Sequence, residues 1–349
     1  MASFSLPQLP VYERKPAPPL IPGIEDAYLA LAAPLVAYWA MSALFHLFDV
    51  FDIFPQYRLH TPAEVLKRNR VGRWECLRDV LVQQALQTLA GLGTHLYLGG
   101  DTLVTQEYAI SLWARRVRIC QRVIPIAFAA VGLDSQAISK HLGRQSTFGS
   151  VLAGGISSDS RNMSSVHGGQ MDSSLEYLAW ELFVAKAIYH FIFPALQFLL
   201  AMFVVDTWQY FLHRLMHTNK WCYRTFHVRH HRLYVPYAYG ALYNHPLEGF
   251  VGDTVGTGVA FIVSGMSTRQ AILFFTIATI KTVDDHCGYK IPWDPLQCFT
   301  SNNAEYHDIH HQSWGMKTNF SQPFFTFWDG FFGTKWVGDA EKKRKSLKL

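Results

Sequence analysis

Long apolar runs alternate with polar segments along the chain, and the longest of them predict membrane-spanning helices. Between residues 27 and 48 there is no Asp, Glu, Lys or Arg, and about 20 apolar residues suffice for a helix to cross a bilayer. A second long apolar run covers residues 185–205, with one charged residue, Lys186, at its start. Residues 80–98 are a poorer candidate because they include three glutamines and a histidine. We therefore expect other helices to shield that segment from lipid.

Residues 255–280 hold two shorter apolar runs, which are split by the polar stretch SGMSTRQ at 264–270. Neither run is long enough to span a bilayer alone, so we interpret the pair as a tilted or re-entrant hairpin. The whole pattern predicts an all-α integral membrane protein with about four transmembrane helices. The polar segments that follow residue 206 are expected to form a helical domain outside the bilayer.

Basic residues indicate the orientation. The loop after the first span, residues 49–79, carries six Lys or Arg residues, against two in the N-terminal flank, and the more basic side normally faces the cytosol. Two further crossings return the chain to the cytosol near residue 206, so the helical domain is expected to be cytosolic. The arginines at 115–118 would then lie on the opposite side, which counts against this topology.

Changes in composition divide the chain into five parts. Residues 1–26 form a Pro-rich tail, facing the cytosol or the lumen, without the apolar core of a cleavable signal peptide. Insertion would therefore rely on the first span of the N-terminal membrane region, residues 27–133. Residues 134–174 are rich in Ser and Gly, and we predict a low-complexity disordered insertion there. Residues 175–336 form the domain that we interpret as catalytic, and residues 337–349 form a basic tail.

Composition excludes several classes of protein. Only 16% of the residues are charged, against about 25% in soluble domains. The net charge of +5 comes from clusters beside apolar spans, and no basic face on a polar domain suggests a nucleic-acid partner. The five cysteines have no C-x-x-C spacing, so we expect neither a disulfide scaffold nor a thiolate metal site.

Histidines are concentrated in one part of the sequence. Ten of the 16 lie between residues 213 and 311, in the motifs HRLMH, HVRHH, NHPLEG, DDHCGY and HDIHH. Residues i, i+3 and i+4 share one face of a helix, so we expect HRLMH, HVRHH and HDIHH each to direct their imidazoles towards a common point. The ten residues are His213, His217, His227, His230, His231, His245, His286, His307, His310 and His311.

Neutral imidazole is the commonest metal ligand in proteins, and the number of these side chains indicates two metal ions. A catalytic zinc takes three protein ligands and water, so eight to ten convergent histidines exceed what one ion needs. Imidazole without thiolate suits non-haem iron at least as well as zinc. We predict all ten as ligands, although His245 could instead position Glu248 or line a substrate channel. The other six histidines are interpreted as surface or core residues.

Carboxylates near the motifs are expected to orient the ligands. Such groups often accept the second imidazole N–H of a metal-binding histidine. The residues in this predicted role are Asp206, Asp284, Asp285, Glu305 and Asp308.

The three histidine motifs resemble the histidine boxes of the membrane fatty acid hydroxylase and sterol desaturase superfamily. Their context is similar to one branch, the fungal sphinganine C4-hydroxylases, from about residue 27 to about residue 334. The stretches that carry this resemblance are VDTWQYFLHRLMH, VPYAYGALYNHPLEG, TVDDHCGY and HDIHHQSWGMKTNFSQPFFTFWD.

The resemblance implies an O₂-dependent monooxygenase of sphingolipid biosynthesis that hydroxylates C4 of sphinganine or its N-acylated form. It implies two iron ions, which zinc can replace in a purified sample, and electrons from NAD(P)H through cytochrome b5 and its reductase. It also implies a multi-pass protein of the endoplasmic reticulum membrane, in a complex with other sphingolipid enzymes. No catalytic residue is expected beyond the metal ligands, and we expect Tyr237, Tyr239 and Tyr243 to line the substrate path.

Two alternatives remain at this point. A sterol C5-desaturase or C4-methyl oxidase would carry the same histidine boxes. A membrane metal transporter would also bind metal, but it would place its ligands at mid-membrane depth. Here arginines flank the motifs, which favours a position outside the hydrocarbon layer: Arg214, Arg224, Arg229 and Arg232.

Overall fold

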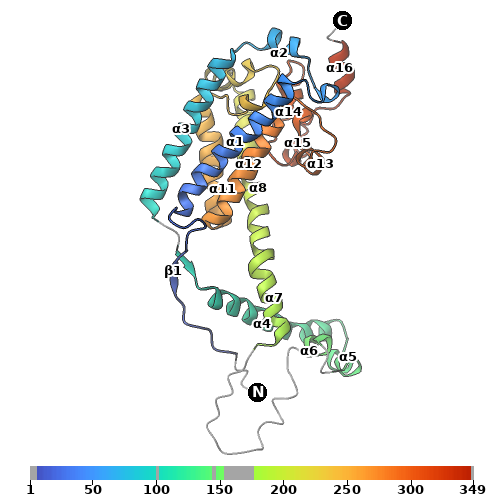
Figure 1. Ribbon diagram of the computed structural model, residues 1–349. Helices are drawn as coiled ribbons and strands as arrows, with labels where there is room; N and C mark the ends of the chain where they lie inside the picture. Colours follow the sequence, from blue (N-terminus) through green and yellow to red (C-terminus); the bar gives the residue numbers. More distant parts are fainter. Residues whose placement is uncertain (1–5, 100–101, 144–146, 153–176, 347–349) are drawn as a thin grey trace, which may run out of the picture. The chain divides into compact units, whose positions relative to one another are not determined.

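A computed structural model describes residues 6–99, 102–143, 147–152 and 177–346 (Figure 1). The chain separates into two compact units. Unit 1 contains residues up to Ala17 and Asp101–Leu196, and unit 2 contains Pro18–Gly100 and Gln197–Leu349. All ten histidines predicted as metal ligands lie in unit 2.

Unit 1 is built around a helix pair. Its elements are β1 (Arg14–Pro16), β2 (Thr102–Val104), α4 (Gln106–Ala130), α5 (Ser135–His141), α6 (Thr147–Leu152), α7 (Ala179–Ala187) and the π-helical turn η3 (Ile188–Ile192). The two strands pair antiparallel, with Lys15 opposite Leu103. Helix α4 packs on α7 through the buried carboxylate of Glu181, which accepts hydrogen bonds from Arg118 and Gln121.

The predicted disordered insertion at 134–174 is wrong for its first residues. Helix α5 begins there because the Asp134 side chain accepts hydrogen bonds from the backbone N–H groups of Gln136 and Ala137, a typical N-cap. The Ser139 hydroxyl donates to the Gly149 carbonyl at 2.6 Å, which ties α5 to α6. Residues 144–146 and 153–174 of the predicted insertion lie outside the described residues.

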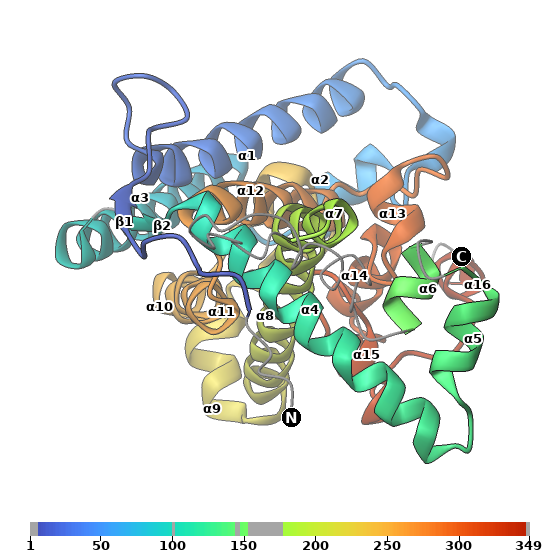
Figure 2. The ribbon, with the colours of Figure 1, turned by 90° about the horizontal axis from the view of Figure 1, so that it is seen from below.

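Unit 2 is a bundle of long helices with short elements gathered at one end (Figure 1). Helices α1 and α12 lie side by side in both views (Figure 1, Figure 2). The elements before α10 are α1 (Asp26–Val50), η1 (Pro55–Tyr57), α2 (Pro62–Arg68), α3 (Arg73–Leu98), α8 (Phe193–Thr218, which starts in unit 1), α9 (Lys220–Cys222), η4 (Tyr223–His227), η5 (His230–Arg232) and η6 (Ala238–Gly240). The remainder are α10 (Pro246–Gly249), η7 (Phe250–Val255), α11 (Gly256–Ser264), α12 (Thr268–Asp285), α13 (Pro295–Phe299), α14 (Ala304–His311), α15 (Phe327–Phe331) and α16 (Ala340–Ser346).

Three helical segments among the described residues are long and apolar enough to cross a membrane: Asp26–Val50, Ala179–Thr218 and Pro246–Ser264. The first two contain the two apolar runs that the sequence predicted. The poorer candidate, residues 80–98, lies in the 26-residue helix α3, but α3 is not among the three segments. Its Gln83 and Gln84 are buried, and Gln84 accepts a hydrogen bond from the indole N–H of Trp39 on α1 at 3.0 Å. Other helices therefore shield these amides, as expected.

The predicted hairpin at 255–280 is found as two helices, α11 and α12, but the expectation that neither run could span a bilayer alone is wrong for the first, because α10, η7 and α11 form one continuous helical segment, Pro246–Ser264, that is long and apolar enough to cross a membrane. Helix α11 ends at Gly265, whose φ of 62° is left-handed, a conformation that glycine adopts without strain. Helix α12 begins with a capping box in which Ser267 and Gln270 bond each other's backbone N–H groups. This tight turn places the C-terminal end of α12 at the end of the bundle where the short elements gather (Figure 1).

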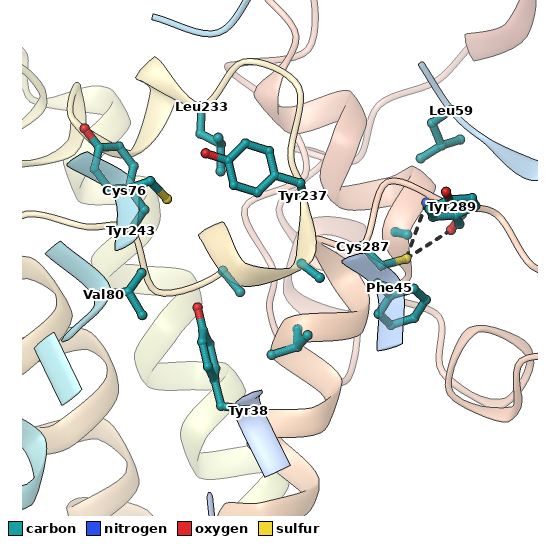
Figure 3. Close-up of a cluster of buried hydrophobic side chains, with 14 of the residues drawn as sticks. Tyr38, Phe45, Leu59, Cys76, Val80, Leu233, Tyr237, Tyr243, Cys287 and Tyr289 are labelled. Atoms are coloured by element: carbon teal, nitrogen blue, oxygen red, sulfur yellow. Dashed lines mark hydrogen bonds between the residues drawn. The ribbon is translucent and has the colours of Figure 1, made fainter. Parts of the chain in front are cut away.

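A cluster of buried side chains joins α1, α3 and the segment around η6. Tyr38 and Cys76 meet Tyr237 and Tyr243 there (Figure 3), and the Tyr38 hydroxyl donates to the Tyr239 carbonyl at 2.9 Å. Tyr237 and Tyr243 are therefore buried core residues, and Tyr239 packs against the same cluster. All three tyrosines thus contribute to this core, and their place on the substrate path stays a prediction.

Gly315 provides a test of the packing next to the last histidine motif. A Cβ at this buried position would strike the backbone carbonyl of Ile309 in α14. We expect Gly315→Ala to destabilise the protein by about 1–3 kcal/mol, the usual cost of overpacking. The matched control is Gly330→Ala, because a Cβ at Gly330 would meet nothing within 4 Å. Thermal unfolding of the purified protein in detergent compares the two, and equal midpoints would contradict the described packing.

Candidate metal centre

Elements from distant parts of the chain carry the histidines to one place. His213 and His217 lie one turn apart near the end of α8, and His286 follows the last residue of α12. His227 ends the π-helical turn η4, and His230 and His231 begin the 3₁₀ turn η5. Helix α14 carries His307, His310 and His311. The motif HVRHH is thus two different short turns rather than the regular helical turn that its spacing predicted.

Nine of the ten predicted histidines form two groups. Within each group, one ring nitrogen from every member lies within 4.8 Å of the others. The five-histidine group consists of His213, His217, His227, His231 and His310, and the four-histidine group consists of His230, His286, His307 and His311. All nine side chains are buried except His217, which is intermediate. Groups of this size, in this number, can hold two metal ions.

Each H-x-x-H-H motif divides its imidazoles between the two groups, which corrects the expectation of a single common point. His227 and His231 join the five-histidine group, whereas His230 joins the other. In the second motif the assignment is reversed, because His307 and His311 join the four-histidine group and His310 does not. Neighbouring positions on a helix are about 100° apart, so the i+3 and i+4 rings diverge. The two motifs thereby bridge the groups.

Hydrogen bonds to the backbone fix the orientation of most rings. The Nδ1 atoms of five histidines lie 2.7–3.1 Å from backbone carbonyl oxygens, and a carbonyl oxygen can only accept. Nδ1 therefore carries the proton, and Nε2 of the neutral ring presents a lone pair. The five pairs are His213 with Phe320, His230 with Tyr243, His286 with Thr282, His310 with Thr318 and His311 with Leu233.

A sixth ring is oriented by a carboxylate. Nδ1 of His227 donates to Oε1 of Glu248 at 2.5 Å, and both side chains are buried. Glu248 lies one helical turn after His245. His245 caps the short helix α10, because its Nδ1 accepts the backbone N–H of Leu247 at 3.2 Å. A charged partner increases the basicity of a ligating imidazole, so His227 is expected to be the strongest donor of its group.

Within each group, several Nε2 atoms lie close to one another. In the five-histidine group, Nε2 of His227 lies 2.7 Å from that of His217 and 3.0 Å from that of His231. In the four-histidine group, Nε2 of His307 lies 2.9 Å from that of His286 and 3.0 Å from that of His311. Two nitrogens about 2.1 Å from one metal ion and at right angles would be about 3 Å apart.

Burial keeps these rings in the form that binds metal. Loss of hydration lowers the pKa of His227 to about 3, and burial together with the neighbouring His227 lowers the pKa of His230 to about 4. Both imidazoles are consequently neutral at pH 7. Nε2 of His310 is buried and has no hydrogen-bond partner among the described residues, a costly state that a bound cation would relieve. The donor set therefore fits metal ions.

His245 is the one predicted ligand that the structure leaves outside both groups. Its Nδ1 accepts the N–H of Leu247, and its ring packs edge-on against Phe226. The alternative interpretation, that His245 positions Glu248, agrees with this geometry. His245 is the N-cap of the helical turn α10, and Glu248 lies within that turn.

The five carboxylates predicted to orient ligands bond elsewhere, so that prediction is wrong. Asp206 accepts the N–H groups of Phe324 and Phe325, and Asp284 accepts from Gln297. Asp285 pairs with the buried Lys281. Glu305 pairs with Lys290 and Arg344. Asp308 accepts hydrogen bonds from Arg344, Gln312 and His60. Sequence proximity could not reveal that backbone carbonyls and Glu248 take the orienting role.

Two arginines in and beside the motif HVRHH, Arg229 and Arg232, anchor it to α3. Arg232 donates to the carboxylate of Glu75 at 2.6 Å and 3.1 Å, and to the carbonyl of Arg70 at 2.8 Å and 3.0 Å. Arg229 pairs with the buried carboxylate of Asp79. These arginines directly flank His230 and His231. Their ion pairs with Glu75 and Asp79 therefore fix η5 against the N-terminal turns of α3.

Comparisons with known proteins connect this geometry to a family. The profile of the fatty acid hydroxylase family matches residues 198–334, the segment that contains both histidine groups. A sphingolipid C4-hydroxylase of Saccharomyces cerevisiae is 39% identical over 341 residues, which cover 97% of this chain and 80% of that protein. A sphinganine C4-monooxygenase of Arabidopsis thaliana is 36% identical over 322 residues, covering 92% of each chain.

A third relative has a different name. A very-long-chain aldehyde decarbonylase of Oryza sativa subsp. indica is 58% identical over 311 residues, which cover 89% of each chain. No solved structure matches this chain.

Metal analysis of two histidine variants tests the grouping. We expect His227→Ala to release metal from the five-histidine group, with a loss of affinity beyond the roughly 10–100-fold that removal of an outer partner of a ligand causes. His245→Ala is the matched control, since this ring lies outside both groups, and it should retain the wild-type metal content. The measurement is elemental analysis of each protein purified in detergent. Equal loss from both variants would show that His245 also binds metal.

Proposed function

The chain belongs to the fatty acid hydroxylase family, and we propose that within this family it hydroxylates C4 of sphinganine or of its N-acylated form. The observation that carries the proposal is the pair of buried histidine groups within a chain whose length is matched by sphingolipid C4-hydroxylases. In the overall reaction a C–H bond becomes C–OH, while O₂ accepts two electrons and two protons and its second oxygen leaves as water. The product would be phytosphingosine or phytoceramide.

Two iron ions, held by the nine grouped histidines, would supply the activation of O₂ that attack on an unactivated C–H bond requires. The protein's own contribution is to keep the imidazoles neutral, orient their Nε2 atoms and exclude water. Backbone carbonyls and Glu248 perform the orientation. We propose NAD(P)H, cytochrome b5 and its reductase as the electron source, because no nucleotide-binding motif is present in the sequence.

A lipid substrate is consistent with the position of the histidine groups at the ends of membrane helices. The end of α8 carries two ligands, and the end of α12 is followed by a third. We propose that α1, α3, α8 and the α11–α12 hairpin form four membrane passages, and that their histidine-bearing end faces the cytosol. The basic loop after α1 lies at this end, as do Arg229 and Arg232 beside the motif HVRHH. Basic residues are more frequent on the cytosolic side of membrane proteins, which favours this orientation. The endoplasmic reticulum is the proposed membrane.

Decarbonylation of a very long-chain aldehyde is a second candidate, and the 58% identity to the rice relative favours it. That reaction acts on a different functional group, so the two candidates predict different products. We give priority to C4 hydroxylation because two relatives with that activity in their names match nearly the whole chain. The same coverage argues against a sterol oxidase or a metal transporter.

Product analysis decides between these reactions. Microsomes that contain the protein, cytochrome b5 and NADPH should convert sphinganine into a base with one additional oxygen at C4, as shown by mass spectrometry with fragmentation. His230→Ala should abolish the product, because this ring belongs to the four-histidine group. A very-long-chain aldehyde is supplied in parallel. Hydrocarbon formation without C4 hydroxylation of sphinganine or dihydroceramide would reject the proposal and support the second candidate.

A further inference from the structure

The outward face of α14 carries two acidic residues that have no place in the metal groups. His307, His310 and His311 point inward, whereas Glu305 and Asp308 lie one helical turn apart and bond to residues outside the centre. This helix has only eight residues, and isolated helices shorter than about 12–15 residues are marginal in water. Its orientation therefore depends on tertiary contacts.

Asp308 is the centre of these contacts. Its carboxylate is 1% exposed. Oδ2 accepts from Nη2 and Nε of Arg344 at 2.8 Å and 3.2 Å. Oδ1 accepts from Nε2 of His60 at 2.8 Å and from Nε2 of Gln312 at 3.2 Å. His60 and Arg344, which lie near opposite ends of the sequence, thus meet on one side chain of α14.

Arg344 differs from its basic neighbours in the C-terminal tail. Its side chain is 10% exposed, and it also donates to Oε1 of Glu305 at 3.1 Å. Lys345 is 72% exposed and pairs with Glu341 at the surface, and Lys343 is exposed as well. Arg344 is therefore inserted between two carboxylates of α14, while the surrounding lysines remain in solvent.

The geometry points to a positioning role for Arg344 and His60. We propose that they hold α14 through Asp308 so that its three imidazoles serve both histidine groups at a fixed separation. The proposal rests on the proposed function in that the groups bind metal ions. Helix α14 and turn η5 are the elements that supply both groups, and each is held from outside by charged side chains, α14 by Arg344 and η5 by α3.

Two physical arguments support the assignment to Arg344. Removing one partner of a buried ion pair leaves an uncompensated charge, which is strongly destabilising. Without Arg344, the Asp308 carboxylate would move towards solvent, and α14 would rotate with it. Furthermore, a guanidinium can bond two carboxylates in fixed directions, whereas an ammonium is a single point charge. Lysine at position 344 should consequently restore only part of the effect.

Cobalt binding provides the test. Full-length protein purified in detergent is freed of metal and titrated with Co²⁺, and the visible d–d absorption reports the number and environment of the bound ions. We expect wild type and the matched control Lys343→Met to bind two equivalents with the same spectrum. Arg344→Met should bind Co²⁺ at least about 10-fold more weakly, with an altered spectrum, and Arg344→Lys should fall between them. With iron, kcat for hydroxylation should fall while KM for sphinganine changes little.

Several results would overturn the proposal. These are full Co²⁺ binding with an unchanged spectrum in Arg344→Met, or equal losses in Arg344→Met and Lys343→Met. If circular dichroism shows that Arg344→Met is unfolded, Arg344→Lys decides, and a wild-type spectrum there overturns the proposal. Wild-type protein that binds two Co²⁺ ions but does not hydroxylate sphinganine when loaded with iron would reject the proposed reaction alone, because the role of Arg344 is measured by metal binding.

Discussion

The candidate centre depends on one interaction, the hydrogen bond from imidazole Nδ1 to a fixed acceptor. That bond places the proton on Nδ1, leaves the Nε2 lone pair free, and sets the direction in which it points. The acceptors are carbonyls of residues such as Tyr243, Thr318 and Phe320, which belong to loops rather than to the long helices. The positions of these acceptors therefore decide whether the six Nε2 lone pairs oriented in this way converge.

The five-histidine and four-histidine groups are joined by elements that contribute imidazoles to both. Turn η5 and helix α14 do so because adjacent histidines on a short turn diverge by about 100°, and one ring of each motif reaches the other group. Such short elements have little stability of their own. Ion pairs from α3 and from the C-terminal tail, and a hydrogen bond from His60, stabilise them. These anchoring residues lie outside residues 198–334, which match the family profile, so the centre is a property of nearly the whole of unit 2.

The long helices and the candidate centre are connected in the same way. Helices α8 and α12 bring His213, His217 and His286 to one end of the bundle. A lipid chain can stay in the bilayer while its polar end approaches this level. That arrangement suits oxidation of a carbon near the head of a sphingoid base, which is the reaction named for relatives that match most of the chain.

Much of this architecture could be predicted from local patterns. The apolar runs determined the helices at 27–48 and 185–205, the polar break at 264–270 determined the α11–α12 turn, and the spacing of the histidines indicated a site for two metal ions. These features depend on residues that are close in sequence, where periodicity and hydropathy act directly. Tertiary structure alone decided which histidines share a metal group, that His245 is excluded, and that Glu305 and Asp308 face Arg344 instead of an imidazole. The physical reason is that many hydrogen-bond partners in this centre are far apart in the sequence, such as His213 and Phe320 at 107 residues and His311 and Leu233 at 78 residues, and only the packed chain brings them within bonding distance.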